Sequence, residues 1–123
     1  MEERQQVTVL IVDDEELIRD AIAFSFNRKG FKILSAANGN QAFEFIQNEK
    51  IDLVISDLQM PECDGVSLLR KVRETLYTTP FIFISGGKIL SASECTQLGA
   101  RKFLLKPFDY KDLHNSALEI LGL

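Results

Sequence analysis

The segment VLIVDDEE, from Val9 to Glu16, decides how the rest of the chain is interpreted. Its first four residues are apolar, and its last four are carboxylates with no basic residue among them. A short apolar run that ends abruptly in polar residues is typical of a buried strand. Acidic residues also favour the N-terminus of a helix, so DDEE by itself is consistent with a simple helix start. The segment predicts a strand followed at once by a helix, with Glu15 and Glu16 serving only that start.

Downstream of this segment the hydrophobic spacing becomes helical, through Leu17, Ile18, Ala21 and Ile22. The same spacing recurs in three later segments, through Ala42, Phe43 and Ile46, through Leu69, Val72 and Leu76, and through Leu113, Ala117, Ile120 and Leu121. The polar segment 91–98 is the weakest helix prediction. Gly30 and Gly99 are expected to end the first and fourth helices, and Asp109 is expected to cap the last.

Four further apolar runs resemble the first, so that five strands are predicted at 7–12, 31–36, 51–56, 81–85 and 101–106. They are short, rich in Val, Ile and Phe, and flanked by turn residues. Strands that alternate with helices through short connections predict a parallel sheet with helices on both faces. Ligands of such sheets bind beyond the carboxyl ends of the strands.

The residues that end these strands carry the chemistry: Asp13 and Asp14, Asn38 and Gly39, Asp57, Ser85 and Lys106. Three carboxylates at one edge repel one another, and one lysine does not balance them. A small set of hard oxygen ligands favours Mg²⁺, which keeps several waters and completes its shell with phosphate. The repulsion also predicts that loss of either adjacent carboxylate, Asp13 or Asp14, stabilises the metal-free protein.

Length and composition bound the class of protein. With 123 residues, 46% hydrophobic and 26% charged, the chain is expected to form one soluble domain over 1–123, with its core at about 7–121. A net charge of −4 with no Lys/Arg block argues against a nucleic-acid surface. Cys63 and Cys95 are expected to be free thiols. No apolar stretch is long enough for a membrane span, so a cytoplasmic protein is expected.

The sequence resembles the receiver domain of two-component response regulators over nearly its whole length, from about Val7 to Leu121. The matching stretches are VLIVDDE, DLVISDLQMPECDG, FIFIS and GARKFLLKPF. The second is the most specific, because an Asp after an apolar strand is followed by Leu-x-Met-Pro and then by Asp-Gly. The resemblance implies a flavodoxin-like (βα)5 fold with strand order 2-1-3-4-5, in a bacterial phosphorelay.

The resemblance also implies a role for each matching residue. Asp57 would accept a phosphoryl group from a histidine kinase or a phosphotransfer protein. Asp13 and Asp14 would hold Mg²⁺, with Asp57 and the backbone carbonyl of Gln59 as further ligands. Lys106 would contact the phosphoryl oxygens.

For the switch, the resemblance implies that the Ser85 hydroxyl would bind the phosphoryl group and that the Phe103 rotamer would follow that contact. It implies a cis peptide before Pro107. The output would be a changed affinity for a downstream protein or output domain, with no nucleic acid or membrane contact from this chain. The only reactions catalysed would be phosphorylation and slow dephosphorylation of the chain itself.

The chain departs from the family pattern after the switch serine. Gly86 and Gly87 follow Ser85 directly, and the segment from Ser85 to Gly99 is about one residue shorter than in the commonest receivers. Glycine leaves the backbone little restrained. The length and placement of the fourth helix are therefore the least certain part of the predicted fold.

Two alternatives stay open at the level of the sequence. A haloacid dehalogenase-type phosphatase also uses an aspartyl phosphate, but its nucleophile follows the first strand in an Asp-x-Asp arrangement, whereas Asp13 and Asp14 are adjacent here. A pseudo-receiver would keep the fold and bind partners without phosphorylation. The intact set of acidic, hydroxyl and lysine residues argues against this second alternative.

Overall fold

The computed structural model describes residues 6–60, 64–75, 77–86 and 92–123. The strands in these residues are β1 (Thr8–Val12), β2 (Lys32–Ala36), β3 (Leu53–Asp57), β4 (Phe81–Ser85) and β5 (Lys102–Leu105). The helices are α1 (Glu16–Asn27), α2 (Gly39–Asn48), α3 (Gly65–Glu74), α4 (Ala92–Gln97) and α5 (Tyr110–Leu121). All strand pairs are parallel, and their order is β2-β1-β3-β4-β5. The predicted α/β fold and its strand order are confirmed.

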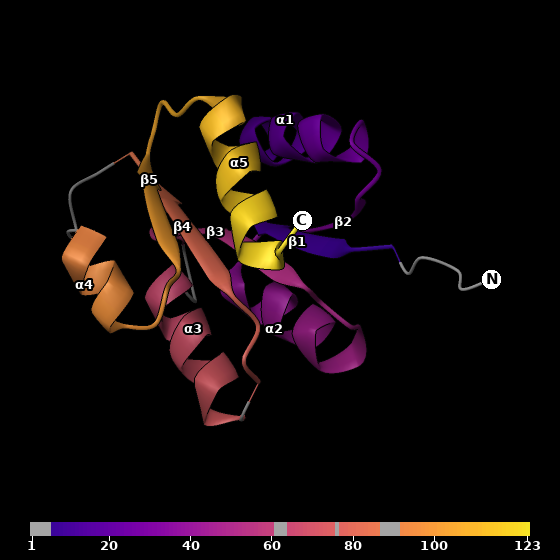
Figure 1. The fold of residues 1–123 in the computed structure, drawn as a ribbon. Coiled ribbons are helices and arrows are strands. Elements are labelled where there is room, and N and C mark those ends of the chain that lie inside the picture. The colour runs from indigo at the N-terminus through magenta and orange to yellow at the C-terminus, as the bar shows by residue number, and fades with distance from the viewer. Residues whose placement is uncertain (1–5, 61–63, 76, 87–91) are drawn as a thin grey trace.

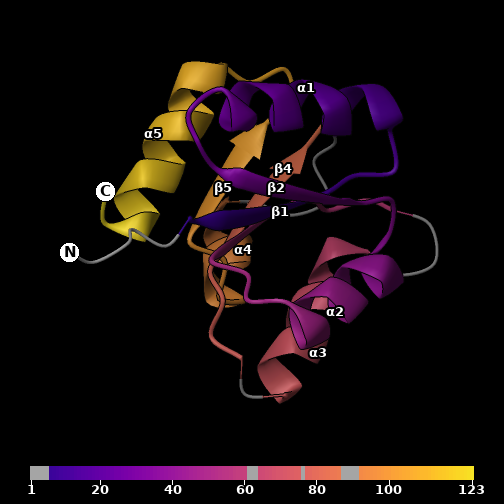
Figure 2. The same cartoon turned by 90° about the vertical axis from the view of Figure 1, so that its right-hand side faces the viewer.

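Helices cover both faces of the sheet, with α1 and α5 on one side and α2 and α3 on the other (Figures 1 and 2). The alternation of side chains along β1 explains why both faces are apolar. Val9 and Ile11 pack with residues of α1 and α5, whereas Leu10 and Val12 pack with residues of α2 and α3. The central strands β1, β3 and β4 are buried throughout. The edge strands β2 and β5 are only partly buried, because each has one neighbouring strand.

The buried face of α1 differs from the predicted one. Ile22 and Phe26 are buried against the sheet, whereas Leu17 is 84% exposed and Ala21 is also exposed. Ile18 is half-buried and packs against this core. Residues 17 and 21 fit an apolar helical stripe. The stripe that faces the sheet instead runs through Ile18, Ile22 and Phe26, one position later along the helix. Sequence spacing alone does not distinguish the two.

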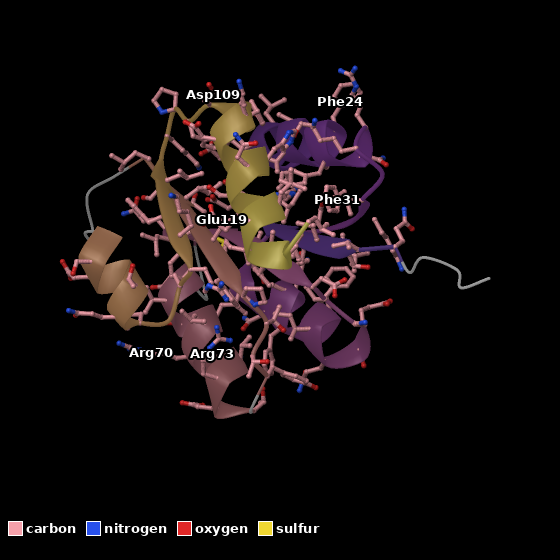
Figure 3. The ribbon with its side chains drawn as sticks, viewed as in Figure 1. Phe24, Phe31, Arg70, Arg73, Asp109 and Glu119 are labelled. Carbon is pink, nitrogen blue, oxygen red and sulfur yellow. The ribbon has the colours of Figure 1, made fainter. Side chains whose placement is uncertain are left out.

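Helix ends follow the sequence signals in most places. The Asp109 side chain accepts a hydrogen bond from the Lys111 N–H at the start of α5, at the top of the view in Figure 3. Gly99, with φ of 105°, follows α4 as expected. Gly30 has φ of 90° but lies two residues beyond the cap of α1 at Arg28, one residue later than predicted. The predicted α3 residue Leu76 and the thiol of Cys63 lie outside the described residues.

No helix in the described ranges has both the length and the apolar character that a membrane span requires.

One polar contact joins α1 to α5. Nε2 of His114 lies 3.0 Å from the Ser25 hydroxyl, and the imidazole meets the Phe26 ring edge-on. The Ser25 hydroxyl donates its proton to the Ile22 carbonyl, so Nε2 must donate to Ser25. Burial, together with the positive charge of Lys29, lowers the pKa of His114. The packed helix pair therefore favours the neutral imidazole.

This contact predicts a loss of stability in mild acid. Because the folded state holds His114 below its ordinary pKa, the unfolded chain binds more protons as the pH falls through about 6.5. The free energy of unfolding, measured with urea, should decrease between pH 7.5 and pH 5.5. His114→Gln, which removes the only histidine of the chain, should lose less over the same interval. An equal loss in both proteins would exclude this origin.

Candidate functional site

The carboxyl ends of three adjacent strands bring the predicted residues together. Asp13 directly follows β1, Asp57 is the last residue of β3, and Ser85 is the last residue of β4. Asp57 was expected in a loop after its strand, but it lies within the hydrogen-bonded sheet, opposite Ile84. All three residues are buried. The sheet therefore fixes the backbones of Asp57 and Ser85, whereas Asp13 lies one residue beyond the end of β1.

Lys106 connects the two carboxylates, Asp13 and Asp57. Its Nζ atom lies 3.0 Å from Oδ2 of Asp13 and 3.0 Å from Oδ2 of Asp57. The other oxygen of each carboxylate accepts a backbone N–H, from Glu15 at 2.9 Å for Asp13 and from Gln59 at 3.1 Å for Asp57. The backbone N–H of Lys106 donates to the Ser85 carbonyl at 2.8 Å, which holds the lysine at the end of β4.

Burial and charge oppose each other in this arrangement. Burial raises the pKa of the Asp13 carboxyl, although hydrogen bonds from the Glu15 N–H and from Lys106 act in the opposite direction. Burial also disfavours the charged form of Lys106, but its hydrogen bonds to Asp13 and Asp57 outweigh that effect and raise the pKa of the lysine. Lys106 therefore stays protonated at neutral pH and serves as the counter-charge inside the site.

Four carboxylates approach closely enough to share one cation. Asp13, Asp14, Glu15 and Asp57 each offer an oxygen, and these oxygens all lie within 4.8 Å of one another. Glu15 was expected only to start the helix. Instead, the residue makes no side-chain cap, and its Oε1 atom lies 3.8 Å from Nζ of Lys106. That expectation was wrong because helix-start signals say nothing about a lysine 91 positions later. Hard carboxylate oxygens of this kind are ligands that suit Mg²⁺.

The two adjacent aspartates differ in their surroundings. Asp13 is fully buried and hydrogen-bonded, whereas Asp14 is exposed. Replacing Asp14 with Asn is therefore expected to stabilise the metal-free protein by about 1 kcal/mol, the interaction of unit charges ~4 Å apart in water. Thermal unfolding in EDTA measures this gain, and added Mg²⁺ should reduce it, because the wild type then gains more from binding.

Asp13→Asn is the matched comparison for this prediction. It removes the same charge but places an amide where Lys106 now meets a buried carboxylate. Its metal-free stability should therefore fall, which reverses the gain that the sequence predicted for the loss of Asp13. A gain of equal size in both variants would show that burial and the contact with Lys106 do not distinguish Asp13 from Asp14.

The other residues singled out from the sequence differ in burial and in the contacts they make. Phe103 lies half-buried on β5 beside Phe83. Gln59 is exposed. The Lys106–Pro107 peptide is cis, as the resemblance implied. Asn38 caps α2 by accepting the Gln41 N–H, a helix-starting role outside the acidic cluster.

Gly65, the glycine of the Asp-Gly pair in the most specific matching stretch, has a packing role that the sequence pattern did not predict. A Cβ atom at Gly65 would lie 2.4 Å from the carbonyl oxygen of Asp57 and 3.1 Å from the Phe83 ring. The Gly65 N–H donates to the Leu58 carbonyl at 3.1 Å, so the first residue of α3 packs directly on the end of β3. The pair Asp64-Gly65 was the only sequence signal for this contact.

Comparison with known proteins gives consistent matches. The family model for the response regulator receiver domain matches residues 9–118. Sporulation initiation phosphotransferase F of Bacillus subtilis is 32% identical over 116 residues, covering 94% of each chain. Regulatory protein AtoC of Escherichia coli is 34% identical over 107 residues, which span 86% of this chain but only 23% of that protein. The receiver domain of the Francisella response regulator 1452 superposes with a TM-score of 0.89 at 28% identity, covering 95% of this chain and 98% of that one.

Proposed function

The chain belongs to the response regulator receiver family of two-component systems, and on that premise we propose that it is a signalling switch phosphorylated on Asp57. Receivers are signalling modules of phosphorelays rather than classical enzymes, and they work with histidine kinases or phosphotransfer proteins. The observation that carries the proposal is the position of Lys106, 3.0 Å from both Asp13 and Asp57.

In the proposed reaction an oxygen of Asp57 attacks the phosphorus of a phosphohistidine. A P–O bond forms, the P–N bond breaks, and its electron pair, with a proton, stays on the imidazole of the partner. The N–H of Gln59 holds the other oxygen of Asp57 and so orients the carboxylate. Lys106 already contacts the attacking residue and can follow the charge onto the phosphoryl oxygens.

The acidic cluster supports the Mg²⁺ part of the proposal. Asp13, Asp14, Asp57 and the backbone carbonyl of Gln59 would hold the ion, and Glu15 lies close enough to contribute. The chemistry of the donor set fits, since hard carboxylate oxygens converge on a site where Lys106 is the only cation that the described salt bridges place among them. Bound Mg²⁺ would supply positive charge that neutralises the phosphoryl oxygens.

We also propose how phosphorylation is read out. The Ser85 hydroxyl, buried at the end of β4, would bind the phosphoryl group, and Phe103 on the adjacent strand would turn further inward. This change would alter the affinity for a downstream protein or output domain. The chain would act in the cytoplasm, as a single receiver domain over 1–123 with its core at about 7–121.

Intact mass spectrometry tests this function directly. The wild type is incubated with acetyl phosphate, with Mg²⁺ or with EDTA, and free phosphate is assayed in parallel. The expected result is a single added phosphoryl group that requires Mg²⁺. Continuous release of phosphate without an adduct would indicate a phosphatase instead. No reaction with either acetyl phosphate or phosphoramidate would indicate a pseudo-receiver.

A further inference from the structure

Arg19, on the first turns of α1, reaches back to the end of β1. Its Nη1 atom donates a hydrogen bond of 2.7 Å to the backbone carbonyl of Asp13. Its own N–H bonds to the Glu15 carbonyl at 3.1 Å, inside the helix. The guanidinium forms no ion pair with any carboxylate in the described ranges. Its contact with the acidic site therefore runs through the backbone and not through a charge pair.

This bond completes the set of contacts around Asp13. The N–H of Asp13 donates to the Ala36 carbonyl at 3.2 Å, and its two carboxylate oxygens accept from Glu15 and Lys106. The carbonyl was the remaining polar group, and Arg19 binds it. All four polar groups of Asp13 are thus held, each by a different residue.

The held carbonyl also controls Asp14. A peptide unit is planar, so fixing the oxygen of Asp13 fixes the N–H and the Cα atom of Asp14. The Asp14 side chain is exposed, and the structure gives it no hydrogen bond with a described residue. Its direction toward the other carboxylates therefore depends on the backbone, and the backbone at this point depends on Arg19.

We propose that Arg19 is a positioning residue that holds the Asp13–Asp14 peptide in the orientation that the cation site requires. This inference rests on the proposed function, since it concerns the same acidic site. It assigns a role to a residue that touches neither the metal nor the phosphoryl group.

The opposite interpretation, in which Arg19 acts only through its charge, predicts a result of the opposite sign. Removing a positive charge near an acidic cluster should tighten Mg²⁺ binding. Removing a positioning hydrogen bond should weaken it, and the loss of an outer-shell partner commonly costs 10- to 100-fold in metal affinity. The sign of the change therefore separates charge from position.

The experiment is a Mg²⁺ titration of Arg19→Met by isothermal calorimetry, with Arg28→Met as the matched control. Arg28 lies at the far end of the same helix, where its guanidinium sits 5.8 Å from the centre of the Phe24 ring. We expect Kd for Mg²⁺ to rise about tenfold in Arg19→Met. Arg28→Met, whose charge is remote and screened, should stay near the wild-type value.

A second readout uses acetyl phosphate. Arg19→Met should need more Mg²⁺ for half-maximal phosphorylation and approach the wild-type rate at saturating Mg²⁺. Arg19→Lys, which keeps the charge and can still donate, should recover part of the affinity, and it serves as the test variant should Arg19→Met not fold. Affinity equal to or tighter than that of Arg28→Met would overturn the inference, while phosphorylation of the wild type would leave the proposed function standing.

Discussion

Asp57→Asn is expected to abolish phosphorylation completely while leaving the fold intact. The amide matches the carboxylate in shape. Its oxygen can still accept the Gln59 N–H, which donates to Oδ1 of Asp57 at 3.1 Å in the wild type. It cannot act as the nucleophile, because a neutral amide oxygen is far less nucleophilic than a carboxylate and cannot form the acyl phosphate. Intact mass after incubation with acetyl phosphate and Mg²⁺ should show the unmodified protein only.

Asp52→Asn is the control for this substitution. Asp52 directly precedes β3, at the end of the strand opposite Asp57, and its carboxylate accepts the Thr8 N–H at 2.9 Å. This variant loses the same charge and should be phosphorylated at the wild-type rate. One phosphoryl group added to Asp57→Asn at that rate would show that another residue is the acceptor.

Gly65→Ala is expected to lower the free energy of unfolding by about 2–4 kcal/mol. Alanine is the better helix former by about 1 kcal/mol, so helix propensity predicts the opposite sign. The cost arises because the new methyl group would lie 2.4 Å from the Asp57 carbonyl oxygen and 3.2 Å from the Cα atom of Leu58. Both obstacles are backbone atoms and cannot turn aside, so α3 must move away from β3.

The same displacement should slow phosphorylation, since the carbonyl that is pushed belongs to the proposed acceptor itself. Urea unfolding and the initial rate with acetyl phosphate measure the two effects. Gly86→Ala is the control, because a Cβ there would meet only side-chain atoms of Lys106, at 3.8 Å and beyond. It should keep wild-type stability, and an equal loss in both variants would show that glycine flexibility, not space, matters at residue 65.

The hydrophobic pattern was enough to predict the architecture. Runs such as Val9–Val12, followed by residues at helical spacing, identify a strand that is buried on both faces and a helix that returns across the sheet. Handedness then places every strand end at one edge. For that reason Asp13, Asp57, Ser85 and Lys106 could be grouped before any distance was known.

The same pattern was less accurate about which side of an element is buried. Leu17 and Ile22 both suit an apolar helical stripe, yet only Ile22 faces the sheet. The choice depends on how the helix rotates to pack on β1 and β2, and residues from across the core decide that rotation. The strand limit at Asp57 has a similar origin, since its place in the sheet comes from pairing with β4.

The sequence by itself determined which kinds of side chain meet at the functional edge, because period and connection length are local properties of the chain. Only the tertiary structure distinguished a buried Asp13 from an exposed Asp14 and brought Glu15 within 3.8 Å of Lys106. It alone shows that Arg19 holds the Asp13 carbonyl and that Gly65 leaves no room for a methyl group. These features are distances between atoms that the folded backbone brings together, and neither propensity nor spacing encodes a distance of that kind.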